Sequence, residues 1–126
     1  MTREVSLAEL PEDLQILILQ VLESCDIQLM DEHADSMRLP VRTLPINLFP
    51  DTPIISSGDD RDLTYAKEMI NQKLPPIVIC GNQWIDGRHR LWALKKMKVK
   101  SVRCIDLQSL IGTYPFPKIA TITSEL

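Results

Sequence analysis

The chain has 126 residues, of which 44% are hydrophobic and 25% are charged, and its formal net charge is −3. This length and composition are typical of one globular domain with a sizeable hydrophobic core, here residues 1–126. The longest apolar run in the first thirty residues, Ile16–Leu19, is far too short to span a bilayer. The start of the chain also lacks the apolar stretch of a signal peptide. We therefore expect a cytoplasmic protein with no membrane partner.

The first 36 residues contain nine acidic residues and one basic residue, and they include the first predicted helix. Pro11 suits the start of a helix, and the acidic side chains that follow it suit the first turn, where the helix dipole favours negative charge. Apolar residues then recur at helical spacing, at Leu14, Leu17, Ile18, Val21 and Leu22. We expect a helix over Pro11–Ser24 within an acidic N-terminal extension, residues 1–36.

The next two predicted elements are a strand and a helix. Val41–Pro50 has the composition of an extended strand, and its two prolines indicate either an edge strand or strand ends. Arg61–Gln72 follows as a helix, with an apolar stripe of Leu63, Ala66, Met69 and Ile70.

A strand–strand–helix–strand unit is predicted between Leu74 and Asp106. Its first strand is β-branched and apolar, and Gly81-Asn82 is a turn signal between two antiparallel strands. The four elements are Ile77–Cys80, Gln83–Asp86, Gly87–Met97 and Val99–Leu107. The tail that follows has weak signals, of which the β-propensity of Ile119–Thr123 is the clearest. The whole pattern predicts an α/β (α+β) fold.

The three cysteines, Cys25, Cys80 and Cys104, are an odd number without CxxC spacing. This pattern does not suit paired structural disulfides and favours a reducing compartment. Cys80 and Cys104 fall in predicted strands, so we interpret both as buried strand residues.

The residues at the start of the helix at Gly87 are typical of a phosphate-binding site. A helix N-terminus presents backbone N–H groups and the positive end of the helix dipole, which together form an anion site. Gly87 permits the sharp turn and a close approach of a ligand. Arg88, His89 and Arg90 add cationic donors in a turn where positive charge is unfavourable by about 0.3–1 kcal/mol per group, and a bound anion would resolve that conflict.

Two simpler interpretations of these residues stay open. Arg88 and Arg90 can pair with a nearby acid such as Asp86, and Asp86 can instead cap the helix. The surrounding segment, Gly87–Arg103, contains seven Lys or Arg residues and no acid. It is either a solvated helix face or a basic surface for an anionic ligand, although the acidic chain does not have the charge of a protein that binds duplex DNA by charge alone.

The pattern of these elements resembles the core of the ParB/sulfiredoxin superfamily over about residues 42–107. The matching segments are Leu44–Leu48, Arg61–Gln72, Pro76–Ile79, Asp86–Ala93 and Val99–Cys104. The resemblance implies a small fold with a mixed sheet and helices, to which this chain adds an acidic N-terminal helix. It also implies nucleotide-phosphate binding at this helix start. Activities in the family range from CTP hydrolysis and ATP-dependent repair of oxidised peroxiredoxin to serine phosphorylation and DNA cleavage.

Departures from the family motifs narrow these activities. Sulfiredoxins carry a nucleophilic cysteine before their His-Arg pair, whereas this chain has Arg88 there. Of the Gly-Glu-Arg-Arg box of partition proteins, only Gly87, Arg90 and the later Ala93 match. From the length of the chain we do not expect the DNA-binding and dimerisation domains of those proteins. The Asp-Gly-His-His-Arg motif of the serine kinases is closer, but their additional Glu has only Asp51 near its place.

We therefore consider three hypotheses of function. The first is a small enzyme that binds ATP or CTP with Mg²⁺ and cleaves a phosphate bond. Its phosphate-binding residues would be Gly87, Arg88, His89 and Arg90. Asp86 and His89 would be catalytic, and Asp86 would also bind the metal. The second is a non-catalytic protein-interaction or inhibitor module of plasmid or phage type that uses the acidic helix. The third is a DNA-binding regulator with contacts from Lys95, Lys96 and Lys98.

Overall fold

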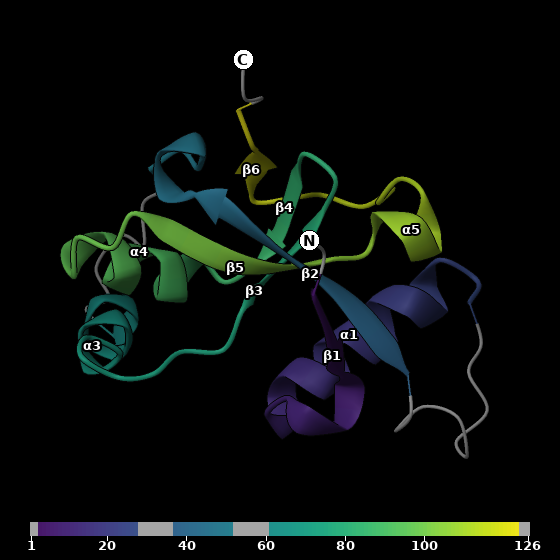
Figure 1. The fold of residues 1–126 in the computed structure, drawn as a ribbon, viewed down its shortest axis with the longest axis horizontal. Coiled ribbons are helices and arrows are strands. Elements are labelled where there is room, and N and C mark those ends of the chain that lie inside the picture. The colour runs from purple at the N-terminus through teal and green to yellow at the C-terminus, as the bar shows by residue number, and fades with distance from the viewer. Residues whose placement is uncertain (1–2, 28–36, 52–60, 124–126) are drawn as a thin grey trace.

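The computed structural model describes residues 3–27, 37–51 and 61–123, which form a mixed six-stranded sheet with helices packed on it (Figure 1). The strand order is β1-β2-β5-β3-β4-β6; β3 and β5 are parallel, and the other neighbours are antiparallel. The predicted α+β fold with a mixed sheet is thus confirmed. Its elements are β1 (Arg3–Ser6), η1 (Leu7–Glu9), α1 (Glu12–Ser24), β2 (Arg38–Pro45), η2 (Ile46–Leu48), α3 (Arg61–Glu68), β3 (Ile77–Cys80), β4 (Gln83–Asp86), α4 (Arg88–Lys96), β5 (Ser101–Asp106), α5 (Gln108–Ile111) and β6 (Ala120–Thr121).

The predicted strand–strand–helix–strand unit is present as β3, β4, α4 and β5. Every residue of β3 is buried, as its β-branched composition indicated. The hairpin between β3 and β4 turns at Gly81, which has a φ of 61°. The β-propensity of the tail is also confirmed, because β6 pairs with β4 through Thr121 and Ala120.

The strand predicted over Val41–Pro50 is corrected at both ends. β2 begins three residues earlier, at Arg38, because β1 pairs with this part of the chain. It ends at Pro45 and passes into the 3-10 turn η2 rather than continuing to Pro50. β2 also lies between β1 and β5, so the edge-strand interpretation is wrong, whereas the alternative, a proline at a strand end, holds for Pro45.

The helix predicted over Arg61–Gln72 ends four residues early, at Glu68. The reason lies at Asn71, whose φ of 68° is left-handed and incompatible with a continuing right-handed helix. Asn tolerates this conformation better than most residues do. The stripe residue Ala66 is fully buried, and Met69 and Ile70 are half-buried in the turn that follows.

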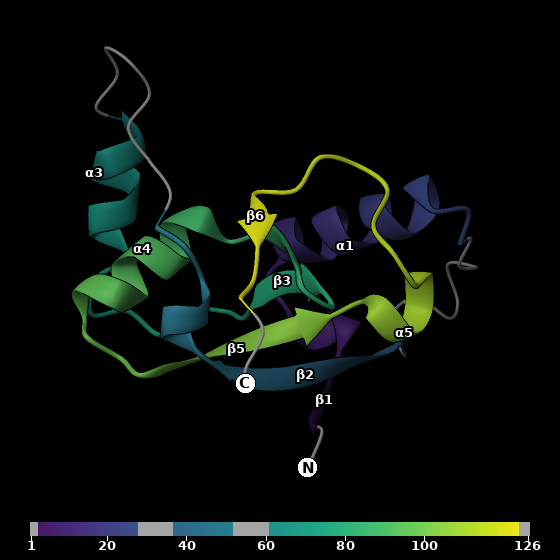
Figure 2. The same cartoon turned by 90° about the horizontal axis from the view of Figure 1, so that it is seen from above.

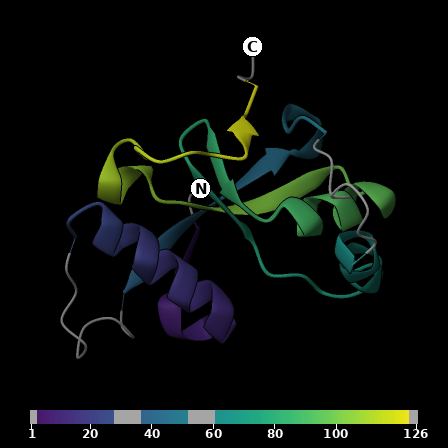
Figure 3. The same ribbon diagram turned by 180° about the vertical axis from the view of Figure 1, so that it is seen from behind.

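The core is divided between the two faces of the sheet. Val78 and Ile105 belong to a cluster with Leu14 and Ile18 of α1, whereas Ile77, Ile79 and Cys104 belong to a cluster with Leu91 of α4. Successive residues of a strand point to opposite faces, which explains this division. Figures 2 and 3 show α1 at one end of the molecule and α3 with α4 at the other.

The predicted helix Pro11–Ser24 is confirmed to within one residue, and its inner face is part of the hydrophobic core. Leu14, Ile18, Val21 and Leu22 are buried there. Within the described ranges, no helix combines the length and apolar character needed to cross a bilayer.

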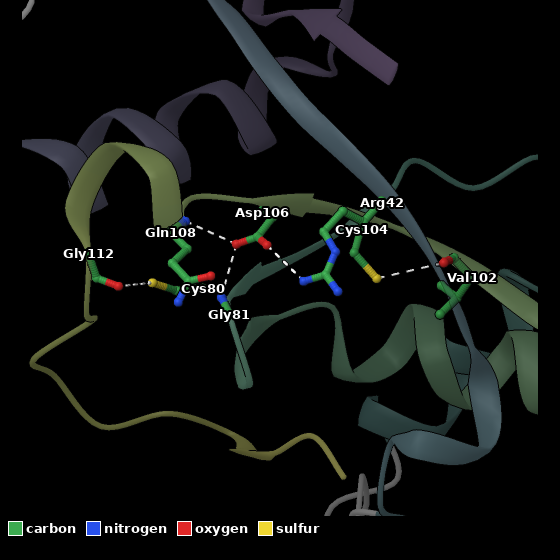
Figure 4. Close-up of polar contacts among 8 residues, drawn as sticks. All are labelled: Arg42, Cys80, Gly81, Val102, Cys104, Asp106, Gln108 and Gly112. Atoms are coloured by element: carbon green, nitrogen blue, oxygen red, sulfur yellow. Dashed lines mark hydrogen bonds and ion pairs between the residues drawn. The ribbon is translucent and has the colours of Figure 1, made fainter. Parts of the chain in front are cut away.

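The end of β5 is joined to its surroundings by one buried carboxylate (Figure 4). Asp106 accepts hydrogen bonds from the backbone N–H groups of Gly81 and Gln108 at 2.9 and 3.0 Å, and its other oxygen lies 3.0 Å from Arg42. Cys80 donates a longer Sγ–H contact to the carbonyl of Gly112, at 3.5 Å. These contacts fix the β3–β4 turn and α5 against β5.

Candidate functional site

The predicted phosphate-binding segment lines a cleft. All five of its residues, Asp86, Gly87, Arg88, His89 and Arg90, border a space of about 640 Å³. The rest of the wall comes from α3 and the segment that follows it, from the start of α1, from β4 and from the residue before β6. These elements contribute Tyr65, Glu68, Met69, Gln72, Lys73, Leu74, Pro75, Pro11, Asp13, Ile85 and Ile119. A volume of this size lies within the range of small-molecule sites, roughly 300–1,000 Å³.

Gly87 joins β4 to α4 in a backbone conformation that requires glycine. Its φ is 111°, which side chains of L-amino acids rarely adopt, and it is the N-cap residue of α4. A Cβ atom at this position would lie 2.5 Å from Cγ2 of Ile77, far inside van der Waals contact. The sharp turn expected at this junction is therefore present, and the bare glycine leaves the helix N-terminus without a capping side chain of its own.

Arg90 is anchored beneath the cleft by Asp86. Nη2 of Arg90 donates to Oδ2 of Asp86, the last residue of β4, at 2.9 Å, and Arg90 is only 9% exposed. The interpretation in which an arginine pairs with Asp86 therefore holds for Arg90. Its Nε is buried and has no hydrogen-bond partner among the described residues, so this guanidinium retains an unused donor in a place where such a group is costly.

An aromatic contact links α3 to the start of α4. The rings of Tyr65 and His89 lie edge to face, with centroids 5.1 Å apart and an interplanar angle of 78°. Sequence reasoning did not find Tyr65, because no local motif marks a residue that reaches a site about twenty positions away. Its position is known only once α3 is placed against α4.

The cleft contains both signs of charge. Asp13, Glu68 and Asp86 line it together with Lys73 and the two arginines. Among the residues that the structure describes, no three His, Cys, Asp or Glu side chains gather closely enough to hold a metal ion. Mg²⁺ commonly uses phosphate oxygens and water as ligands beside one or two carboxylates.

The lysines predicted to contact nucleic acid differ in their surroundings. Lys95 donates at 2.7 Å to the carbonyl of Phe49 and at 2.7 Å to Asp51. The hydrogen bond and charge of Lys95 lower the pKa of Asp51. Lys96 lies 5.4 Å from the ring centre of Trp92, and Lys98 is exposed. The ammonium of Lys95 is thus engaged within the chain, and the nucleic-acid role of all three stays a prediction.

The cysteines lie away from the cleft. Cys80 and Cys104 are buried in β3 and β5, which confirms their interpretation as core residues. Burial raises the pKa of the Cys104 thiol to about 12, and it raises the pKa of Cys80 as well. Thiols in this form are poor nucleophiles.

The outer face of α1 is exposed, in contrast to its buried inner face. Glu12, Asp13 and Glu23 lie on this face with Ile16, which is 49% exposed. A protein partner for this helix stays a prediction.

No protein-family model matches this chain, and no match was found among curated proteins or solved structures.

Proposed function

We propose that this protein binds a nucleotide through its phosphates at the N-terminus of α4, as the resemblance to the ParB/sulfiredoxin superfamily implies. The observation that carries the proposal is the position of Arg90. Its buried guanidinium has an unpartnered Nε, and Arg90 and the N-terminus of α4 both border a cleft of about 640 Å³. A phosphate oxygen is an acceptor suited to such a donor.

The backbone around Gly87 supports the same ligand. Gly87 is the N-cap of α4 and provides no capping side chain, so a phosphate can accept hydrogen bonds from the first N–H groups of the helix. Arg88 and His89 border the cleft in the same turn, and Arg88 would add positive charge. The pair formed by Asp86 and Arg90 holds the guanidinium in place before the ligand arrives, which lowers the entropic cost of binding.

The carboxylates in the cleft favour a nucleotide bound with Mg²⁺, and we propose ATP or CTP as its ligand. A bare triphosphate would be repelled by Asp86, whose side chain is 41% exposed, and by Asp13 and Glu68. A divalent cation between carboxylate and phosphate removes this repulsion.

The proposed reaction is hydrolysis of a phosphate bond, on the nucleotide or in DNA. Water attacks the phosphorus, the bond to the leaving oxygen breaks, and the proton of the water passes to Asp86 or His89. The free cysteines fit the cytoplasmic location that we propose for this enzyme.

Binding is tested by thermal unfolding with ATP, CTP and ADP, each with and without Mg²⁺. A ligand that binds the native state raises its stability by RT ln(1 + [L]/Kd), about 2.7 kcal/mol at a hundredfold excess over Kd. The informative variant is Arg88→Ala, which should weaken binding about tenfold, and the matched control is Lys100→Ala, an exposed cation outside the cleft. Folded protein that shows no shift at millimolar nucleotide would overturn the proposal.

A further inference from the structure

The cleft has two chemically different ends. One is the charged start of α4, residues 86–90. The other is mainly apolar and comes from α3, the turn after it, β4 and the residue before β6, through Tyr65, Met69, Leu74, Pro75, Ile85 and Ile119, although Glu68, Gln72 and Lys73 of α3 and its turn lie among them. Inorganic phosphate would use only the first end, so the apolar end has room for a further part of the ligand.

Tyr65 is the aromatic side chain of that apolar end. It is 51% exposed, although the next residue, Ala66, is fully buried and holds α3 against the core. The N–H of Asn71 lies 3.1 Å from Sδ of Met97, which ties the chain after α3 to the end of α4. Tyr65 thus projects from a fixed helix into the cleft and does not itself fill the core.

The ring of Tyr65 also adjoins the phosphate end. Its edge-to-face contact with His89, at 5.1 Å between centroids, places the aromatic end and the helix start next to each other. A ligand that uses both must join an anionic group to a flat apolar group over a short span. A nucleotide has this construction.

We infer that Tyr65 packs against the base of the bound nucleotide, an assignment that rests on the phosphate site proposed above. Stacking of a base on an aromatic ring accepts every base, because each has a π-face. The contact therefore separates nucleotides from other phosphate compounds, while the choice between ATP and CTP must come from other groups. Tyr65 is in this sense a specificity residue of the cleft.

Calorimetric titration with MgATP, MgCTP and magnesium tripolyphosphate, which has the phosphates but no base, tests the assignment. Wild-type protein should bind both nucleotides about tenfold more tightly than tripolyphosphate, the equivalent of about 1.4 kcal/mol. Tyr65→Ala should remove this preference and leave tripolyphosphate affinity unchanged. Tyr65→Phe keeps the ring and should stay within about twofold of wild type.

The outcomes separate the two proposals. Equal affinity of wild-type protein for ATP and tripolyphosphate overturns the role of Tyr65 and leaves the phosphate site standing, and this comparison needs no variant to fold. If Tyr65→Ala lost affinity for tripolyphosphate as well as for ATP, the base contact of Tyr65 would also be overturned, because Tyr65 would then act through His89. Wild-type protein that binds none of the three compounds overturns the phosphate site together with the base contact.

Discussion

The guanidinium of Arg42 on β2 lies 3.0 Å from Oδ2 of Asp106, the last residue of β5. The two partners are unequal, because the side chain of Arg42 is 45% exposed and that of Asp106 only 9%. The other oxygen of Asp106 accepts two backbone hydrogen bonds, from Gly81 and Gln108. The carboxylate therefore matters mainly as a buried acceptor and only secondarily as an ion-pair partner.

Replacement of Asp106 should show this order of importance. Asp106→Ala leaves two backbone N–H groups without an acceptor, and we expect it to lower the free energy of unfolding by about 2–4 kcal/mol. Asp106→Asn keeps a carbonyl oxygen in the same place and should lower it by about 1 kcal/mol. Urea unfolding followed by circular dichroism measures both. If the two variants were equally stable, the ion pair with Arg42 would be the main contribution.

A side chain at Gly87 should destabilise the fold more than one at another glycine of positive φ. Gly87→Ala adds a Cβ only 2.5 Å from Ile77 Cγ2, in addition to the strain of about 1–2 kcal/mol for a left-handed backbone. Gly112 also has a positive φ, of 76°, but a Cβ there would meet no atom within 4 Å, which makes Gly112→Ala the matched control. We expect losses of about 3 kcal/mol and 1 kcal/mol in urea unfolding. Similar losses would mean that Ile77 shifts to accommodate the new methyl group.

The N-terminal helix should contribute to stability through its inner face alone. Ile18 is fully buried, so Ile18→Ala should lower the free energy of unfolding by about 2–5 kcal/mol. Ile16 sits two positions earlier and is 49% exposed, and Ile16→Ala should change it by no more than about 0.5 kcal/mol. If Ile18→Ala left the free energy of unfolding unchanged, the packing of α1 would not be needed for the fold.

The buried thiol of Cys104 should make the protein sensitive to alkali. Its pKa rises from 9.0 in the reference state to about 12 in the fold, because burial disfavours the thiolate. Between these pH values the unfolded chain loses the proton while the folded chain keeps it. The folded state therefore binds more protons, and its stability falls as pH rises from 9 towards 12, by up to about 1.4 kcal/mol per pH unit.

The variant Cys104→Ala isolates this effect. It loses stability at neutral pH through the smaller side chain, but its unfolding free energy should fall less steeply above pH 9 than that of wild type. Burial also raises the pKa of Cys80, which is present in both proteins and cancels in the comparison. Parallel curves from pH 7 to 11 would show that Cys104 ionises in the fold as readily as in the unfolded chain.

The central unit could be predicted because its signals are local. The β-branched run of β3, the Gly81-Asn82 turn and the glycine before α4 each act on immediate neighbours. The same holds for α1, where apolar residues repeat at helical spacing over the buried face. Such patterns fix both the type of an element and its approximate bounds.

Other features depend on contacts that no local pattern encodes. β1 has four residues without apolar alternation, and it exists because it pairs with β2. The start of β2 was misplaced for the same reason. In the cleft, Asp86–Arg90 could be found from its motif, whereas Tyr65 and Asp13 come from helices that only the tertiary fold brings there.

Asp86 provides a final prediction, in which one substitution should have opposite effects with and without Mg²⁺. Its partly exposed carboxylate borders the proposed phosphate site and pairs with Arg90. Asp86→Asn removes a negative charge near the phosphates, so ATP should bind roughly two- to tenfold more tightly in EDTA, because one unit charge a few ångströms from another contributes about 1 kcal/mol in bulk water. In Mg²⁺ the same variant loses the proposed ligand for the cation, and ATP should bind more weakly than to wild type.

Calorimetric titrations of both proteins in EDTA and in Mg²⁺ measure this reversal. Arg90 loses a charged partner in the variant, so thermal unfolding must first show that the protein is folded at the titration temperature. Glu68→Gln is the matched control, because Glu68 borders the same cleft on α3 and neutralisation there adds the same charge change. It should tighten binding in EDTA without weakening it in Mg²⁺. Identical behaviour of the two variants would place the cation elsewhere and leave Asp86 with only its contact to Arg90.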